Sequence, residues 1–375
     1  MRVLFLQRQP CIRALKYGHA LAAMRPDITL GFAYQGETLT GWYGAGDELF
    51  AQWWRLPADD PGLALAEVID DFAPDLIHSH NLPDTLTVTA VGVAGRRVPV
   101  IHDSHDLQSL RQTPYEDGFD DPSDPAGLES AAVEGCAALI AVSAEMLDAI
   151  AARHRVPPRT MLFPNYALAR DLAPDPPAPR AGGGALRVVY QGSVSVNGSH
   201  YDLRDQFVAL ARSGAAIDVY PNRDAPDYRE LAARTPGMRV MNTLPPAELL
   251  RALADYDVGW AAFNTGVNGA HLDTALPNKA FEYLAAGLPI VAGRHRALAC
   301  LVDEYRVGIV IDDPGELVGR LRPPDLAELR QRVATQRHRF TVESQIERLV
   351  DLYDQTLRDR GGPRSIAAIA AAATS

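Results

Sequence analysis

Short apolar runs alternate with longer amphipathic stretches along the first half of the chain. The apolar runs lie at 3–6, 28–33, 76–78, 98–102 and 139–142, and the amphipathic stretches lie at 12–24, 63–72 and 146–152. Apolar runs separated by helical stretches are typical of strands that helices join into a parallel sheet. The same alternation begins again at residue 186 and continues to 311. The pattern therefore predicts two α/β units with parallel sheets.

The composition changes between these two units. Residues 169–185 hold closely spaced prolines followed by three glycines, and such a segment packs poorly as helix or strand. We predict a first domain at 1–168, a linker at 169–185 and a second domain at 186–341. An apolar stripe at helical spacing predicts a helix at 342–360 that crosses back to the first domain. The Ala-rich tail at 361–375 has too little apolar surface to fold stably, and we expect it to be disordered.

Length and composition fit this division. A chain of 375 residues suits two domains of roughly 150–200 residues each. No stretch reaches the roughly 18 apolar residues that cross a bilayer, and the apolar run at the start is too short for a signal peptide. We therefore expect a cytoplasmic protein with no integral membrane segment. The widely spaced Cys11, Cys136 and Cys300 predict neither a disulfide framework nor a zinc site.

The charge of the chain is unevenly distributed. The formal net charge of −11 argues against binding to nucleic acid or to an anionic membrane, because both need basic patches. Residues 1–166 carry 12 basic and 22 acidic side chains, a net −10, which leaves a net −1 for residues 167–375. The second half is therefore the better host for a ligand that carries phosphates.

The segment from Asp273 to Ala292 carries the most chemical information. Asp273 or Thr274 is expected to cap a helix, with Pro277 in its first turn and Gly287 at its end, before the next strand. This helix would begin at the sheet edge where parallel sheets bind ligands, and its free amide groups attract anions. Lys279 in the first turn opposes the helix dipole, so a bound phosphate explains the lysine better than folding does.

Glu282 is the second polar side chain on this helix. It stands among apolar neighbours, and a carboxylate there needs partners, such as the paired hydroxyls of a ribose. A surface glutamate in contact with solvent explains it equally well. Glycine clusters at 44–46 and 182–184 are read as turns, and the carboxylate run at 116–124 as a solvated loop that could cover an acceptor cleft.

The segment 277–291 resembles the Pro-Asn-Lys-x-x-Glu-Tyr-x-Ala-x-Gly-x-Pro-Ile-Val signature of retaining glycosyltransferases of family-4 type, which have the GT-B fold. Further motifs of that family resemble the segments 74–81, 101–106, 141–144, 163–166 and 189–193, in the family's order. The resemblance covers residues 1–355. It implies an α/β fold of two Rossmann-like domains that face each other across a cleft, the first holding the acceptor and the second the nucleotide-sugar.

The resemblance also implies roles for individual residues. Glu282 would bind the ribose hydroxyls, and His105 would face the anomeric carbon as the catalytic residue. Gly18, in Tyr17-Gly18-His19, would lie beside the donor phosphates. The complete set of donor-binding candidates is Gly18, Gly192, Ser193, Arg223, Thr274, Leu276, Pro277, Asn278, Lys279 and Glu282.

Two positions depart from the family pattern. Thr274 stands where many members have a glutamate that grips the donor sugar, and Ser193 stands where they have an arginine of the phosphate clamp. A clamp lysine is also replaced, by Gly198. Lys279, Arg223 or Arg204 could replace the clamp, and we favour Lys279 because the helix argument places it independently.

The resulting prediction is a hexosyltransferase that uses a nucleotide-sugar, with a UDP-sugar favoured, as co-substrate and has no other cofactor and no metal. It would transfer the sugar with retention to a hydroxyl group of a small soluble acceptor. A non-catalytic sugar-nucleotide-binding subunit and a sugar-nucleotide 2-epimerase stay open as alternatives. The sequence specifies neither the sugar, nor the acceptor, nor the oligomeric state.

Overall fold

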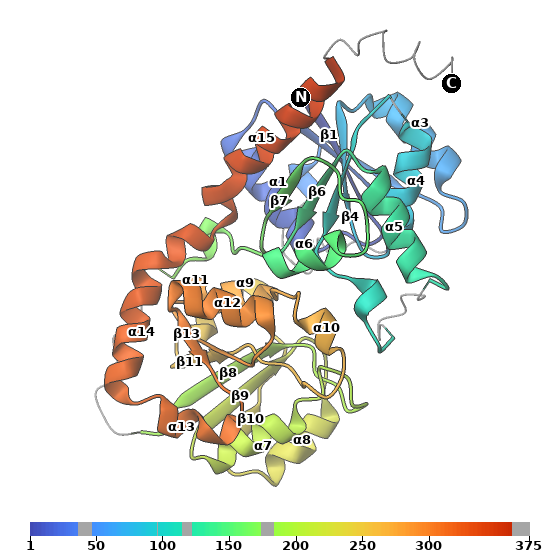
Figure 1. Ribbon diagram of the computed structural model, residues 1–375. Coiled ribbons are helices and arrows are strands. Elements are labelled where there is room, and N and C mark those ends of the chain that lie inside the picture. The colour runs from blue at the N-terminus through green and yellow to red at the C-terminus, as the bar shows by residue number, and fades with distance from the viewer. Residues whose placement is uncertain (37–46, 96, 115–121, 174–183, 362–375) are drawn as a thin grey trace.

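The first sheet has seven parallel strands in the order β3-β2-β1-β4-β5-β6-β7 (Figure 1). The computed structural model describes residues 1–36, 47–95, 97–114, 122–173 and 184–361. The strands are β1 (Arg2–Gln7), β2 (Thr29–Tyr34), β3 (Gln52–Arg55), β4 (Leu76–His80), β5 (Val100–Ser104), β6 (Ala138–Ala141) and β7 (Thr160–Leu162). The helices are α1 (Ile12–Met24), α3 (Gly62–Phe72), α4 (Thr85–Ala94), α5 (Pro125–Gly135) and α6 (Ala144–Ala151).

The second sheet has six parallel strands in the order β10-β9-β8-β11-β12-β13. The strands are β8 (Arg187–Gly192), β9 (Ala216–Pro221), β10 (Met238–Val240), β11 (Val258–Trp260), β12 (Ile290–Ala292) and β13 (Gly308–Val310). The helices are α7 (Arg204–Arg212), α8 (Pro226–Ala233), α9 (Pro246–Leu253), α10 (Gly269–Leu272), α11 (Asn278–Ala285) and α12 (Arg296–Tyr305), and α13 (Leu317–Arg320), α14 (Pro323–Gln336) and α15 (Val342–Gly361) follow them. Two Rossmann-like domains confirm the predicted fold class.

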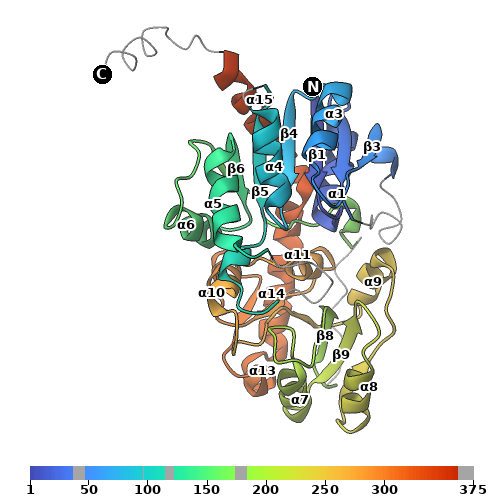
Figure 2. The ribbon, with the colours of Figure 1, turned by 90° about the vertical axis from the view of Figure 1, so that its right-hand side faces the viewer.

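The long C-terminal helix α15 lies against the first domain, although the chain reaches it from the second (Figures 1 and 2). Ile346, Leu349, Val350 and Tyr353 are fully or almost fully buried in one core with residues of β1 and α1. This is the apolar stripe that the sequence predicts for the crossing helix.

Every helix of the described residues is too short or too polar to span a membrane. The glycine cluster at 44–46, most of the carboxylate run at 116–124, most of the linker at 169–185 and the tail at 362–375 lie outside the described residues.

One predicted helix boundary is wrong. The helix that carries Lys279 begins at Asn278, with Pro277 as its N-cap, and neither Asp273 nor Thr274 caps it. Thr274 ends the turn after α10, where its hydroxyl donates to the carbonyl of His271 at 2.7 Å. The Asp273 carboxylate instead accepts from the backbone N–H of Arg296 at the start of α12. Both side chains are thus used by neighbouring helices.

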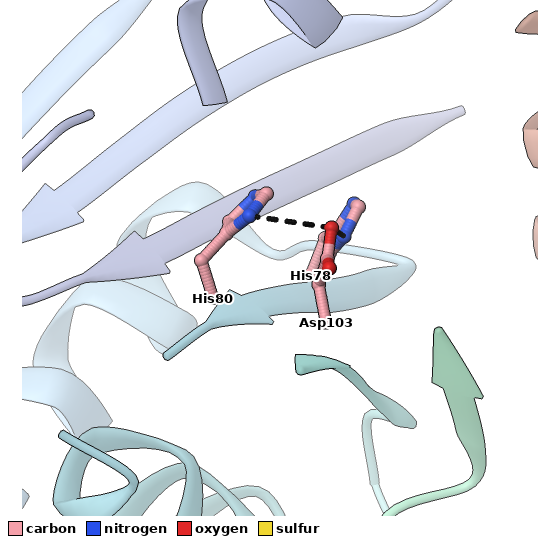
Figure 3. Close-up of side chains that lie close together, drawn as sticks. All are labelled: His78, His80 and Asp103. Atoms are coloured by element: carbon pink, nitrogen blue, oxygen red, sulfur yellow. Dashed lines mark hydrogen bonds and ion pairs between the residues drawn. The ribbon is translucent and has the colours of Figure 1, made fainter. Parts of the chain in front are cut away.

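A buried polar network joins three parts of the first domain. The Arg13 guanidinium of α1 contacts both carboxylate oxygens of Asp103 on β5 at 3.0 Å, and their side chains are 4% and 0% exposed. His78 and His80 of β4 lie beside the same carboxylate, at 3.3 and 3.5 Å (Figure 3). Burial by itself would raise the pKa of Asp103, but Arg13 and His78 hold that pKa well below its ordinary value. The carboxylate is therefore ionised.

The network continues in two directions. His78 Nδ1 lies 2.6 Å from the hydroxyl of Tyr353, so the crossing helix is joined to the centre of the first sheet. Arg13 also donates to the carbonyls of Phe163 and Pro164 and to the side-chain oxygen of Asn165. Asn165 in turn donates to the carbonyl of Leu276 in the second domain at 2.7 Å. One arginine thus fixes the segment from which the chain contacts its other domain.

Replacing Arg13 with methionine is expected to lower the free energy of unfolding by about 3–5 kcal/mol, because Asp103 is left as a buried charge without its counter-ion. Urea unfolding of the purified protein measures this. The matched control is Arg234→Met, which breaks the exposed pair with Glu230, whose side chains are 68% and 77% exposed, and should cost below about 1 kcal/mol. Equal losses for the two variants would contradict the central role given to the buried pair.

Candidate functional site

A cavity of about 660 Å³ lies between the two domains, within the size range of small-molecule sites. Its first-domain wall is formed by α1 and by residues that follow β5. Its second-domain wall comes from the ends of β8 and β9 and from the start of α11. Ligands of parallel sheets bind beyond the carboxyl ends of the strands, which is where this cavity lies.

The start of α11 forms the floor of the cavity. Leu276, Pro277, Asn278, Lys279 and Glu282 all line it, as the sequence predicts. Pro277 has an extended backbone and the helix begins at the next residue. The first amide groups of a helix have no partner within the helix, so they are available to an anion in the cavity.

Lys279 points into this cavity from a buried position. Its ammonium group has no hydrogen-bond partner among the described residues and lies 4.0 Å from the ring centroid of Tyr190. Burial lowers the pKa of Lys279 to about 7, while Glu282 acts in the opposite direction. A side chain at Gly192 would begin 3.5 Å from the ammonium nitrogen, and Gly192 has a φ of +121°, so this position suits glycine. The aromatic face of Tyr190 thus stabilises the ammonium group of Lys279 where the described residues supply it with no hydrogen-bond acceptor.

Glu282 is held between residues of both domains. Its carboxylate accepts from the side-chain amide of Gln191 at 2.6 Å and lies 3.8 Å from the ammonium of Lys16 on α1. Lys16 also donates to the side-chain oxygen of Asn278 at 3.1 Å. The lysine is 4% exposed, and burial lowers its pKa although Glu282 favours its charged form. Glu282, the residue predicted to bind the ribose, therefore lines the cavity, and its side chain is 23% exposed.

His105 follows β5 and lines the opposite wall. Its backbone N–H donates to Asn81 at 3.0 Å, and its Nδ1 is buried without a hydrogen-bond partner among the described residues. Burial lowers the pKa of His105, so the imidazole is neutral at pH 7. Beside it, Asp106 contacts Nε2 of His271 at 3.0 Å across the domain boundary. The neutral ring can exchange hydrogen bonds with a ligand.

The remaining candidates are divided between the cavity and its surroundings. Gly192 and Ser193 line the cavity, whereas Gly18, Thr274 and Arg223 are not among its described lining residues. Gly18 faces Phe50, whose ring would lie 3.0 Å from a Cβ at that position. The alternative clamp residue Arg204 is paired with Asp202. Of the basic candidates for the missing clamp, Lys279 is thus the one in the cavity wall.

Sequence reasoning missed several cavity residues, above all Lys16. A signal for it was present, because the whole chain contains two lysines, Lys16 and Lys279, among 36 basic residues. Both line the same cavity. Other polar residues missed there include His200, His271, Arg170 and Asp171, which lie outside the motifs that the sequence analysis identified.

The histidine and aspartate cluster of β4 and β5 has the spacing of metal ligands. His78, His80 and Asp103 each offer an atom, and these atoms lie within 4.8 Å of one another. The Arg13 guanidinium already bonds both oxygens of Asp103. A divalent ion would have to share that carboxylate with a cation, so the cluster fits a structural network better than a metal site.

Both domains match models of glycosyltransferase domains. The glycosyl transferase 4-like domain matches residues 17–166, and the glucosyltransferase 3-like C-terminal domain matches residues 203–341. Together the two matches span more than half of the chain. The chain has no match among curated protein sequences.

Solved structures of low sequence identity share the fold along almost the whole chain. A sucrose-phosphate synthase from Thermosynechococcus elongatus is 14% identical over 96% of this chain and 100% of its own, with a TM-score of 0.67. A glycosyltransferase from Rickettsia africae is 10% identical over 95% and 98%, with a TM-score of 0.69. HepE from Anabaena, solved in complex with UDP, is 14% identical over 95% and 100%, with a TM-score of 0.65.

Lys279→Met is expected to stabilise the free protein, because it removes a buried charge and keeps an unbranched stem. The pKa of about 7 means that the folded protein carries this charge at acidic pH and has lost it at alkaline pH, where most of the cost has disappeared. The gain in unfolding free energy should be on the order of 1–3 kcal/mol near pH 6 and should shrink toward pH 10. Urea unfolding of both proteins across this range measures it, and a gain independent of pH would argue against a titrating lysine.

Proposed function

We propose that this chain, which belongs to the GT-B-fold glycosyltransferases, transfers a sugar from a nucleotide-diphosphate sugar, with a UDP-sugar favoured, to a hydroxyl acceptor. The observation that carries the proposal is the cavity between the domains. There the start of α11, the buried ammonium of Lys279 and the carboxylate of Glu282 stand opposite His105. These are groups that bind an anion, a vicinal diol and a sugar.

Each part of the donor has a matching wall. The diphosphate lies on the first amide groups of α11 and on Lys279, since both attract negative charge. The ribose hydroxyls donate to Glu282, and the nucleobase extends toward Tyr220, Pro221 and Leu244 at the end of β9 and beyond it. The sugar then points to the wall that carries His105. This orientation places the anomeric carbon next to the first domain, where the acceptor enters.

The proposed chemistry depends mainly on electrostatic stabilisation. As the bond between the anomeric carbon and the diphosphate breaks, negative charge grows on the phosphate that faces Lys279 and the helix amides. These groups supply the positive charge that a divalent cation supplies in other enzymes, and we propose a reaction without metal or other cofactor. The departing phosphate takes the acceptor proton on the same face of the sugar, which gives retention. His105 holds a sugar hydroxyl through its neutral ring.

The replacements at Thr274 and Ser193 favour one rival, a binding subunit without transferase activity. The buried hydroxyl of Thr274 is bonded to His271, so it does not take over the role of a sugar-binding glutamate. Binding of a nucleotide-sugar without hydrolysis or transfer to any acceptor would support this rival. Isomerisation of a UDP-sugar in the absence of acceptor, seen by NMR, would support the epimerase.

Glu282→Gln is expected to lose most of the stabilisation that UDP gives the protein. A ligand at 100 times its dissociation constant stabilises the folded state by about 2.7 kcal/mol, and the variant loses the ionised acceptor for the ribose. Thermal-shift titration with UDP and with a panel of UDP-sugars measures this. Glu230→Gln, at an exposed position on α8, is the matched control and should bind as the wild type does. Unchanged UDP binding by Glu282→Gln would remove Glu282 from the donor site.

His105→Ala is expected to lower turnover by about 10²–10³-fold with little effect on UDP binding, because the ring contacts the sugar and not the nucleotide. Initial rates with the donor found by thermal shift, followed by UDP release, measure the effect. His338→Ala, at an exposed position, serves as control. Parallel losses of UDP affinity and turnover would place His105 at the nucleotide. Assays in the presence of EDTA test whether the reaction is independent of metal. NMR of the product's anomeric configuration tests retention.

A further inference from the structure

The two lysines of the chain reach the donor cavity from opposite domains. Lys16 is on α1 of the first domain and Lys279 on α11 of the second, and both line the cavity. The remaining 34 basic side chains are arginines, and one of them, Arg170, also lines this cavity. A lysine presents a compact charge on a flexible stem, which can change partners within a narrow site.

The side chain of Lys16 on α1 reaches the start of α11. Its ammonium is 3.1 Å from the side-chain oxygen of Asn278, the first residue of α11, and 3.8 Å from a carboxylate oxygen of Glu282. The helix amides that attract an anion and the buried, unpartnered Lys279 belong to the same cavity wall. An anion on this helix end would therefore lie within the reach of both lysines.

The free protein and the proposed complex make different demands on Glu282. In the free protein this carboxylate is the ionic partner of Lys16 and accepts from Gln191. In the complex it accepts from the ribose, and the diphosphate brings new negative charge to the cavity. The interaction of Lys16 with Glu282 weakens and is replaced by a stronger one with the diphosphate, because charge-assisted bonds to phosphate are favourable in a water-poor site.

We propose that Lys16 is a donor-binding residue of the first domain, which turns from Glu282 to the diphosphate when the nucleotide-sugar binds. Together with Lys279 it binds the diphosphate from both sides of the cleft. The two lysines thereby replace the arginine and lysine of the phosphate clamp, whose positions are occupied by Ser193 and Gly198. Because one lysine belongs to each domain, the diphosphate holds the cleft closed. This inference rests on the proposed function and adds to it the residue through which the first domain recognises the donor.

Dissociation constants for uridine, UMP and UDP, measured by calorimetry on wild type, Lys16→Met and Lys16→Arg, test the proposal. Lys16→Met should weaken UDP binding at least about tenfold, a loss of about 1.4 kcal/mol, and leave uridine within about twofold. Lys16→Arg should not restore UDP binding, since the wider guanidinium does not fit a 4%-exposed position. Lys279→Met is the matched variant on the opposite wall and should show the same dependence on phosphate.

Labelling of amines offers a second measurement that does not depend on a variant. With two lysines in the chain, the amine targets of acetic anhydride are Lys16, Lys279 and the N-terminal amine, and mass spectrometry measures the modification of each separately. UDP should protect Lys16 from acetylation, whereas uridine should not, and the N-terminal amine serves as internal control.

Two kinds of failure can be told apart. If wild type binds UDP more tightly than uridine and Lys16→Met does the same, or if both ligands weaken equally, Lys16 only positions Glu282 and the inference is overturned while the donor site stands. If wild type binds neither uridine nor UDP, and UDP protects no lysine, the proposed function fails and the inference fails with it. Circular dichroism of Lys16→Met confirms that the variant is folded.

Discussion

The buried ion pair between Arg13 and Asp103 is the interaction on which the arrangement of the molecule depends. A charged pair shielded from water is tolerated only where further hydrogen bonds satisfy both partners. Here the histidines of β4 face the carboxylate, and the carbonyls of Phe163 and Pro164 accept from the guanidinium. These bonds fix α1 and the segment at 163–165 relative to the first sheet. Both elements continue directly into the cavity.

Two contacts link this network to the parts of the chain that follow the first domain. Asn165 donates to the carbonyl of Leu276 just before α11, and Tyr353 of α15 lies 2.6 Å from His78. The first contact lies just before α11, and the second lies on α15, the helix that packs on the first domain. The contact at Leu276 joins the two domains, whereas the apolar stripe of α15 belongs to the first core. The cavity therefore lies directly at a contact between the two domains.

The electrostatics of the cavity contrast with those of the whole chain. The first half carries most of the negative charge, yet its contribution to the cavity includes the ammonium of Lys16. Lys279 faces it from the second domain, next to an aromatic ring, and finds no acceptor within the part of the chain that the structure describes. Two buried lysines that face one cavity favour a ligand that brings negative charge. A diphosphate is such a ligand, and in the proposed reaction the same groups assist its departure with both bonding electrons.

The sequence by itself determined the strands and helices with strong periodicity, the order of the two domains, and the residues Lys279, Glu282 and His105 as candidates, because each depends on local patterns. Among the elements it missed are the edge strands β3 and β7, which are short, and α4, whose apolar residues leave no polar face to mark a helix. The helices α5 and α14 were missed as well. Only the tertiary structure decided that Thr274 turns away from the cavity and that Lys16 meets Asn278, 262 residues further along the chain. Contacts of that separation follow from how two sheets and a crossing helix pack, and no local pattern contains that information.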